Sequence, residues 1–267
     1  MMNSLIIGQY VPGDSYVHRL DPRTKITIIF FFIFVVFFAN NVPSYSVLVI
    51  FALASVMLSR VPLRFIIKGL TPIWFLVIFT FILHLFVTKE GEVFFDFWHF
   101  EFYTGGVVQG VAISIRFFLL ILVTSLLTLT TTPIEITDAI EDMLRPLNKV
   151  KFPVHELALM MSISLRFIPT LMQETEKISK AQASRGVDFK TGPVKDRIKA
   201  VVPLLVPLFV SAFKRAEELA MAMEARGYQG GEGRSKLREL KIGKLDMIIY
   251  IIFLSVIAVL FYTRTYA

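Results

Sequence analysis

The most informative part of the chain reads PVHELALMMSISLRFIPTLMQETEKISKAQASRG over 153–186 and PVKDRIKAVVPLLVPLFVSAFKRAEELAMAMEARG over 193–227. Each half begins with a proline, which suits the first position of a helix because an N–H there has no intrahelical partner. Each half ends with glycine, the usual helix stop, since glycine adopts a positive φ without strain. The pattern predicts two helices, each roughly 50 Å long at 1.5 Å per residue.

Both predicted helices are apolar in their first part, charged in their second part, and carry an arginine at the end. The two endings are Ser184, Arg185 and Gly186 in the first helix, and Ala225, Arg226 and Gly227 in the second. A cation in the last turn also stabilises the helix dipole, so one such ending by itself needs no function. Its repetition on two helices of the same profile favours a functional interpretation.

The composition indicates a polytopic membrane protein. Of the 267 residues, 55% are hydrophobic and 18% are charged, which is below the usual quarter, and the mean hydropathy is +0.66. The chain has no cysteine, which excludes disulfides, thiolate metal sites and cysteine nucleophiles. The net charge of +7 fits the basic excess of a cytoplasmic membrane face better than it fits DNA binding.

Apolar runs predict five membrane spans, at residues 26–39, 47–58, 71–87, 105–131 and 245–262. The first two are short for a hydrocarbon core of ~30 Å and reach that length only with their flanking residues. The acidic and aromatic segment 88–104 has the character of an external loop in the interfacial belt, compatible with a short hairpin.

A strong helix start follows the fourth span, with a threonine cap, then proline, then glutamate at the third position: Thr132, Pro133, Ile134 and Glu135. The helix that it opens extends to about Leu144 and is amphipathic. It is too short to cross a membrane, so it is predicted to lie at the interface.

The distribution of basic residues predicts the orientation. Residues 132–244 carry nineteen Lys and Arg, against one in 88–104 and none in 40–44. The positive-inside rule then places the N-terminus in the cytoplasm and the C-terminus outside. Three regions are predicted. Residues 1–131 form a membrane region of four spans, and residues 132–244 form a cytoplasmic and interfacial region with the two long helices. Residues 245–267 form a C-terminal transmembrane helix. The fold class is an all-α integral membrane protein.

Arg116 lies inside the fourth predicted span. A charge within a span costs at least ~2.5 kcal/mol on insertion scales, so its side chain is expected to face protein or water. Two interpretations remain open. Arg116 is either a functional residue or a structural one that bonds to carbonyl groups of neighbouring helices.

Methionines and prolines gather in the long helices, which hold or adjoin six of the ten methionines. Methionine suits a surface that accepts several partners, although it also packs a plain helix hairpin. Prolines inside a helix predict kinks. These features suggest a deformable docking surface, with the candidate residues Met160, Met161, Met172, Pro203 and Pro207.

Motifs of catalysis are missing from the sequence. It has no P-loop, no HExxH and no GxSxG, and its four histidines fall in unrelated segments. We therefore expect no catalytic residue, metal site, cofactor or nucleic-acid partner. The alternative is a carrier or membrane enzyme that acts alone and binds an anionic substrate through Arg116.

Several motifs spread over nearly the whole chain resemble one known family. They are GQYVPG (8–13), HRLDPR (18–23), SIRFF (114–118), SLRFIP (164–169), ASRG (183–186), and RAEELA (215–220) continuing to RGY (226–228). These motifs are similar to those of the T component of energy-coupling factor (ECF) transporters, a branch of the ABC transporters that imports vitamins and trace nutrients in prokaryotes. The one mild departure is Ser184, where alanine is common.

The resemblance implies a membrane scaffold in the prokaryotic cell membrane with two cytoplasmic coupling helices. It implies that Arg185 and Arg226, with the residues beside them, dock on two ABC ATPase subunits, which form a heterodimer and hydrolyse the ATP. It also implies that the coupling helices carry an exchangeable substrate-binding S component, for which the methionines and prolines named above are the candidate contacts. The chain itself would then be no enzyme.

Overall fold

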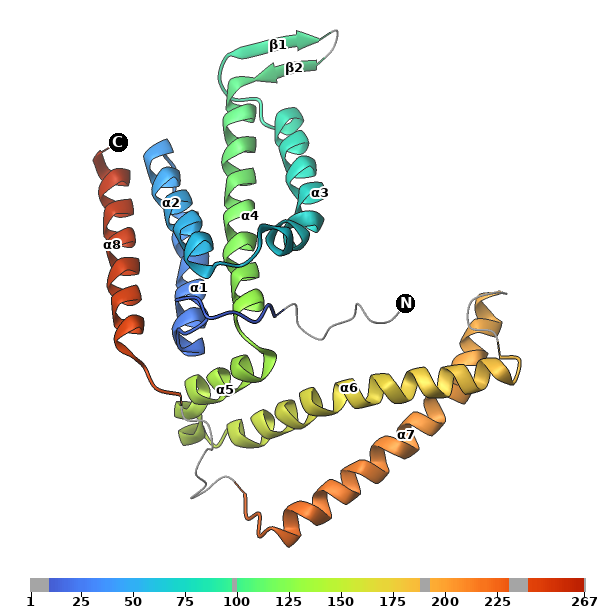
Figure 1. The fold of residues 1–267 in the computed structure, drawn as a ribbon. Coiled ribbons are helices and arrows are strands. Elements are labelled where there is room, and N and C mark those ends of the chain that lie inside the picture. The colour runs from blue at the N-terminus through green and yellow to red at the C-terminus, as the bar shows by residue number, and fades with distance from the viewer. Residues whose placement is uncertain (1–9, 98–99, 188–192, 231–239, 267) are drawn as a thin grey trace. The chain divides into compact units, whose positions relative to one another are not determined.

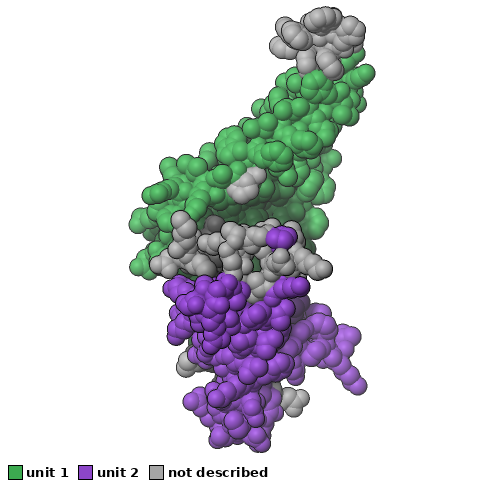
Figure 2. Space-filling model, turned by 90° about the vertical axis from the view of Figure 1, so that its right-hand side faces the viewer, with its two compact units in different colours: residues 1–139, 240–267 green, residues 140–239 purple. Residues whose placement is uncertain are grey.

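The computed structural model describes residues 10–97, 100–187, 193–230 and 240–266. The chain forms two compact units, residues 1–139 with 240–267 and residues 140–239, which Figure 2 distinguishes by colour. Each unit is described by itself below.

Helices and one hairpin make up the first unit (Figure 1). The elements are α1 (Pro22–Phe37), α2 (Val42–Ser59), α3 (Leu63–Val87), β1 (Val93–Phe97), β2 (Phe100–Tyr103), α4 (Thr104–Thr130), the start of α5 (Pro133–Leu144) and α8 (Lys244–Tyr266). The two strands pair antiparallel, which confirms the hairpin predicted in 88–104. Its turn, Trp98 and His99, lies outside the described residues. The other elements are helical, so the all-α fold class is confirmed.

Four helices could cross a membrane, or five if the bent α3 counts as one span, against the five spans predicted, and their membership differs. By length and apolar composition, α2, α4, α6 (Val154–Ser184) and α8 qualify among the described residues. The fifth would be α3, which bends by 52° between Leu63–Thr71 and Ile73–Val87. The helix α1 covers the predicted first span but has 16 residues, fewer than the roughly 20 that a bilayer core requires.

Local sequence signals set the helix starts of the first unit. The Asp21 carboxylate accepts the backbone N–H of Arg23 at 2.9 Å, which caps α1 beside Pro22. At α5 the predicted capping box is confirmed in both directions. The Glu135 carboxylate accepts the N–H of Thr132 at 3.0 Å, and the Thr132 hydroxyl accepts the N–H of Glu135 at 3.3 Å.

The core of the first unit lies where α1, α2, α3, α4 and α8 meet. Its fully buried members include Phe32, Leu48, Leu119, Leu129 and Leu260.

The helices α3 and α4 lie side by side (Figure 1). A Cβ atom at Gly110 would come within 3.0 Å of the Phe81 ring, and one at Gly106 within 3.0 Å of the His84 carbonyl oxygen. Glycine thus permits the close approach of the two helices, as is usual between membrane helices.

The second unit contains the end of α5, a 3₁₀ turn η1 (Arg145–Val150), α6 and α7 (Val194–Ala225). The predicted bounds of the two long helices agree with the structure to within one or two residues. One detail is corrected, because Pro153 and Pro193 occupy the N-cap rather than the first helical position. Both helices continue as single elements through their internal prolines, Pro169, Pro203 and Pro207. The segment GGEG at 230–233 has the composition of a flexible polar linker, and its residues 231–233 lie outside the described residues.

Candidate functional site

The ends of α6 and α7 have the same backbone geometry. Arg185 and Arg226 are the C-cap residues, and the glycines that follow them have φ of +85° and +73°. At the first end, Gly186 N–H donates to the Ala183 carbonyl and Val187 N–H to the Gln182 carbonyl, both at 3.0 Å. This pair of bonds is a Schellman motif, which satisfies carbonyls that the helix leaves unpaired.

The second end has the same motif at the corresponding positions. Gly227 N–H donates to the Glu224 carbonyl at 2.9 Å, and Tyr228 N–H donates to the Met223 carbonyl at 3.0 Å. Ser184, Arg185 and Gly186 are exposed, as are Ala225, Arg226 and Gly227. Each ending therefore presents a guanidinium group from a backbone that its own hydrogen bonds hold in place.

The two arginines lie at opposite ends of an antiparallel helix pair. On α6 the carboxylate of Glu174 accepts a hydrogen bond from the Ser211 hydroxyl of α7 at 2.8 Å, and it forms an ion pair with Arg215. These contacts join the middle of one helix to the middle of the other. Since α6 has 31 residues, the two tips are separated along the pair by on the order of 45 Å.

A second contact joins the helices beside the first tip. Pro207 has no N–H, so the carbonyl of Pro203, four residues earlier, has no helical donor. The side-chain amide of Gln182 on α6 donates to this carbonyl at 3.3 Å. The amide thus satisfies the acceptor that Pro207 leaves open, three residues before Arg185.

The five candidate docking residues do not form one patch. Met160 and Met161 are 55% and 45% exposed in the first third of α6, whereas Met172 is half-buried near its middle. Pro203 and Pro207 lie on α7 at the level of Gln182. The methionine pair and the proline pair are therefore separated by roughly 30 Å along the helices.

Arg116 reaches from α4 to the turn between α1 and α2. Its guanidinium donates to the Tyr45 hydroxyl at 3.1 Å and to the Ala39 carbonyl at 3.4 Å, and it lies 5.1 Å from the centre of the Phe37 ring. These contacts match the structural interpretation of this residue, in which it bonds to the backbone of a neighbouring segment.

Comparison with known proteins shows one family. A family model described as "CbiQ: Cobalt transport protein" matches residues 13–237. The chain is 63% identical over 264 residues to an energy-coupling factor transporter transmembrane protein of Bacillus subtilis, covering 99% of this chain and 100% of the relative. A protein of the same name from Exiguobacterium sibiricum is 52% identical over 260 residues, covering 97% and 99%. The chain belongs to the family of energy-coupling factor transporter transmembrane proteins.

Membership in this family confirms the resemblance that the motifs predicted. The chain is thus the transmembrane component of an energy-coupling factor transporter, a multi-pass protein of a prokaryotic membrane that works in a complex of several components.

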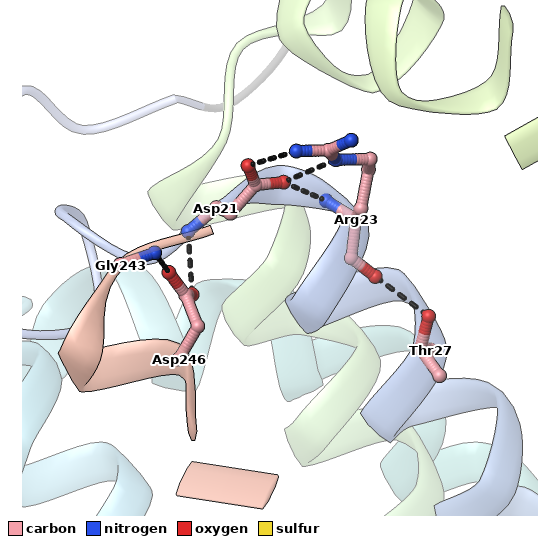
Figure 3. Close-up of polar contacts among 5 residues, drawn as sticks. All are labelled: Asp21, Arg23, Thr27, Gly243 and Asp246. Atoms are coloured by element: carbon pink, nitrogen blue, oxygen red, sulfur yellow. Dashed lines mark hydrogen bonds and ion pairs between the residues drawn. The ribbon is translucent and has the colours of Figure 1, made fainter. Parts of the chain in front are cut away.

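Sequence reasoning missed a buried carboxylate that ties the ends of this transporter component together (Figure 3). Asp246 at the start of α8 is 3% exposed. It accepts the N–H of Asp21 at 2.9 Å with one oxygen and the N–H of Gly243 at 2.8 Å with the other. Asp21 in turn binds the Arg23 guanidinium at 2.9 Å. A lone aspartate before an apolar run gave no signal of this partner 225 residues away.

A buried lysine fixes the end of α4 in the same region. The ammonium of Lys25 donates to the Thr130 carbonyl and to the Thr131 hydroxyl, both at 3.0 Å. Lys25 ends the basic cluster at 18–25 that directly precedes the first predicted span. In this transporter component Lys25 also joins α1 to α4.

Proposed function

We propose that this chain is the scaffold of an ECF-type importer. It couples ATP hydrolysis by two ABC ATPase subunits to the movement of a substrate-binding S component in the uptake of a vitamin or micronutrient. The observation that carries the proposal is the repeated ending: one exposed arginine on each of two helices, held by the same Schellman motif at opposite ends of a braced pair. Catalysis of ATP hydrolysis then belongs to the partners.

The chemistry of arginine supports one ATPase at each tip. A guanidinium is planar and permanently charged, and it forms bidentate, charge-assisted bonds with carboxylates. Because the cap fixes the backbone of Arg185 and of Arg226, less conformational entropy is lost when an acidic groove takes up the side chain. Two tips of the same geometry suit two related ATPase subunits.

An apolar face of α7 supports contact with the S component. Val202, Val206, Phe209 and Phe213 follow one another at helical spacing and are 54%, 57%, 60% and 74% exposed. A continuous exposed apolar face on a helix marks a surface for a protein or membrane partner. The exposed Met160 and Met161 on α6 offer the S component a second, separate apolar surface whose side chains can repack.

The test is co-purification of the ATPase subunits with the tagged chain from detergent-solubilised membranes. The double variant Arg185→Glu, Arg226→Glu is compared with Lys177→Glu, Lys214→Glu, which changes the charge equally at exposed cations of the same two helices. We expect wild type and the lysine variant to retain both ATPases, and the arginine variant to lose them while it still inserts. Equal recovery with all three forms would refute arginine docking.

A further inference from the structure

A polar bracket of three residues holds the second arginine tip. Tyr228 is the last residue of the Schellman motif at that tip, two positions after Arg226. Its hydroxyl lies 3.3 Å from Nε2 of His155 at the start of α6. The other ring nitrogen, Nδ1, lies 3.2 Å from the Glu141 carboxylate near the end of α5. One imidazole therefore connects the tip of α7 with the root of α6 and with α5.

Both hydrogen bonds of this bracket can form whether the imidazole is neutral or charged. When His155 is neutral, Nδ1–H donates to the Glu141 carboxylate and Nε2 accepts the phenol hydrogen of Tyr228. When the ring is charged, Nε2–H donates to the phenol oxygen instead. The side chains of His155 and Glu141 are only 21% and 16% exposed, so water competes little for these bonds.

The first tip is held differently. The residue that corresponds to Tyr228 is Val187, whose side chain has no group that forms a hydrogen bond. Among the described residues, Gln182 beside the first tip donates to the Pro203 carbonyl. The two endings thus share one backbone motif but depend on different side chains.

We propose that Tyr228 and His155 are positioning residues for Arg226, and that the first tip does not depend on them. Loss of the phenol hydroxyl frees the residue that closes the Schellman motif, and the last turn of α7 then frays. Arg226 keeps its charge but loses its fixed direction. The proposal rests on the proposed function in one respect, namely that Arg226 docks an ATPase.

The first measurement reads the position of the tip in the purified full chain, without partners. Because the sequence has no cysteine, spin labels can be placed on introduced cysteines alone. Ala225→Cys with Val150→Cys reports the second tip, and Ser184→Cys with Val202→Cys reports the first; all four positions are exposed. We expect Tyr228→Phe to broaden the distance distribution of the second pair only, and Gln182→Leu that of the first pair only.

The second measurement is the affinity of the ATPase pair for unlabelled Tyr228→Phe, His155→Ala and the double variant, with Tyr16→Phe at an exposed tyrosine as the matched control. Tyr228→Phe is expected to weaken docking about three- to tenfold, as the loss of one hydrogen bond predicts. His155→Ala removes both bonds of the imidazole and is expected to weaken docking at least as much. The double variant is expected to lose no more than His155→Ala, since both changes break the same bracket.

The outcomes separate the bracket from the docking assignment. An unchanged distribution of the second pair in Tyr228→Phe overturns the bracket, and so does equal broadening of both pairs. A broadened second pair with unchanged ATPase affinity supports the bracket and refutes the docking role of Arg226 on which the proposed function depends. His155→Gln keeps hydrogen-bonding groups at this position. Its distance distribution for the second pair is therefore expected to be narrower than that of His155→Ala.

Discussion

A single side chain, Asp246, joins the beginning and the end of the first unit. Its two carboxylate oxygens accept the backbone N–H groups of Asp21 and Gly243, and both aspartates are buried. A carboxylate in such a place is stable because backbone donors compensate for the water that it loses, and the positive charge of Lys25 also acts on it. Removing this carboxylate lowers the free energy of unfolding because the two N–H donors then remain buried without an acceptor.

At this scale we predict the effect of truncating Asp246. Asp246→Ala leaves two N–H groups without an acceptor and is expected to destabilise the chain by about 2–4 kcal/mol. Asp246→Asn keeps one acceptor oxygen and is expected to cost about half as much. The measurement is the midpoint of thermal unfolding in detergent, with Glu218→Ala at an exposed position as the control. Equal midpoints for all four forms would contradict this role.

Each long helix is an element whose end is fixed by its own backbone. The glycines after the two arginines take a left-handed conformation that residues with a Cβ adopt only with strain. A Cβ at Gly186 or at Gly227 would meet no atom within 4 Å. The requirement for glycine here is therefore conformational and not one of space.

The prediction at the scale of the element follows from this distinction. Gly186→Ala and Gly227→Ala are each expected to weaken the helix end by about 1–2 kcal/mol, whereas asparagine at the same positions costs less because it tolerates the left-handed region. The readout is ATPase co-purification, which should fall in the order glycine, asparagine, alanine. Gly69→Ala on α3 is the control, since its Cβ would make ordinary contact with Ser125. An alanine variant that matches wild type would count against the caps.

At the scale of the whole molecule, the function depends on which side of the membrane each segment faces. Nineteen basic residues lie in 132–244, and the predicted external turn 40–44 has none. From the positive-inside rule we predict that both arginine tips lie in the cytoplasm, where ATP would be available to the proposed ATPase partners. The C-terminus lies outside in this orientation.

Single cysteines test the orientation, since the native chain has none to interfere. In intact cells, a membrane-impermeant maleimide is expected to label Val42→Cys and Thr265→Cys but not Glu218→Cys, all of which are exposed. Glu218→Cys should react only after the cells are permeabilised. Labelling of Glu218→Cys in intact cells would reverse the orientation and remove the tips from the ATPase side.

The sequence by itself determined the features whose causes are local. The two long helices, their Arg-Gly ends, the capping box at Thr132 and the hairpin near 93–103 all follow from residues within a few positions of one another, because caps and turns form between near neighbours. The repeated Arg-Gly ending also identifies Arg185 and Arg226 as candidate docking residues from the sequence alone.

Only the tertiary structure decided the contacts between distant residues. Asp246 with Asp21, Gln182 with the Pro203 carbonyl, and Tyr228 with His155 are separated by 21 to 225 positions in the sequence. A polar residue in one helix has many acceptors of equal chemistry available, and its choice depends on how the helices pack and on which groups the packing leaves unpaired. The sequence therefore identifies the arginine tips, while the packing of α5, α6 and α7 determines what holds each of them.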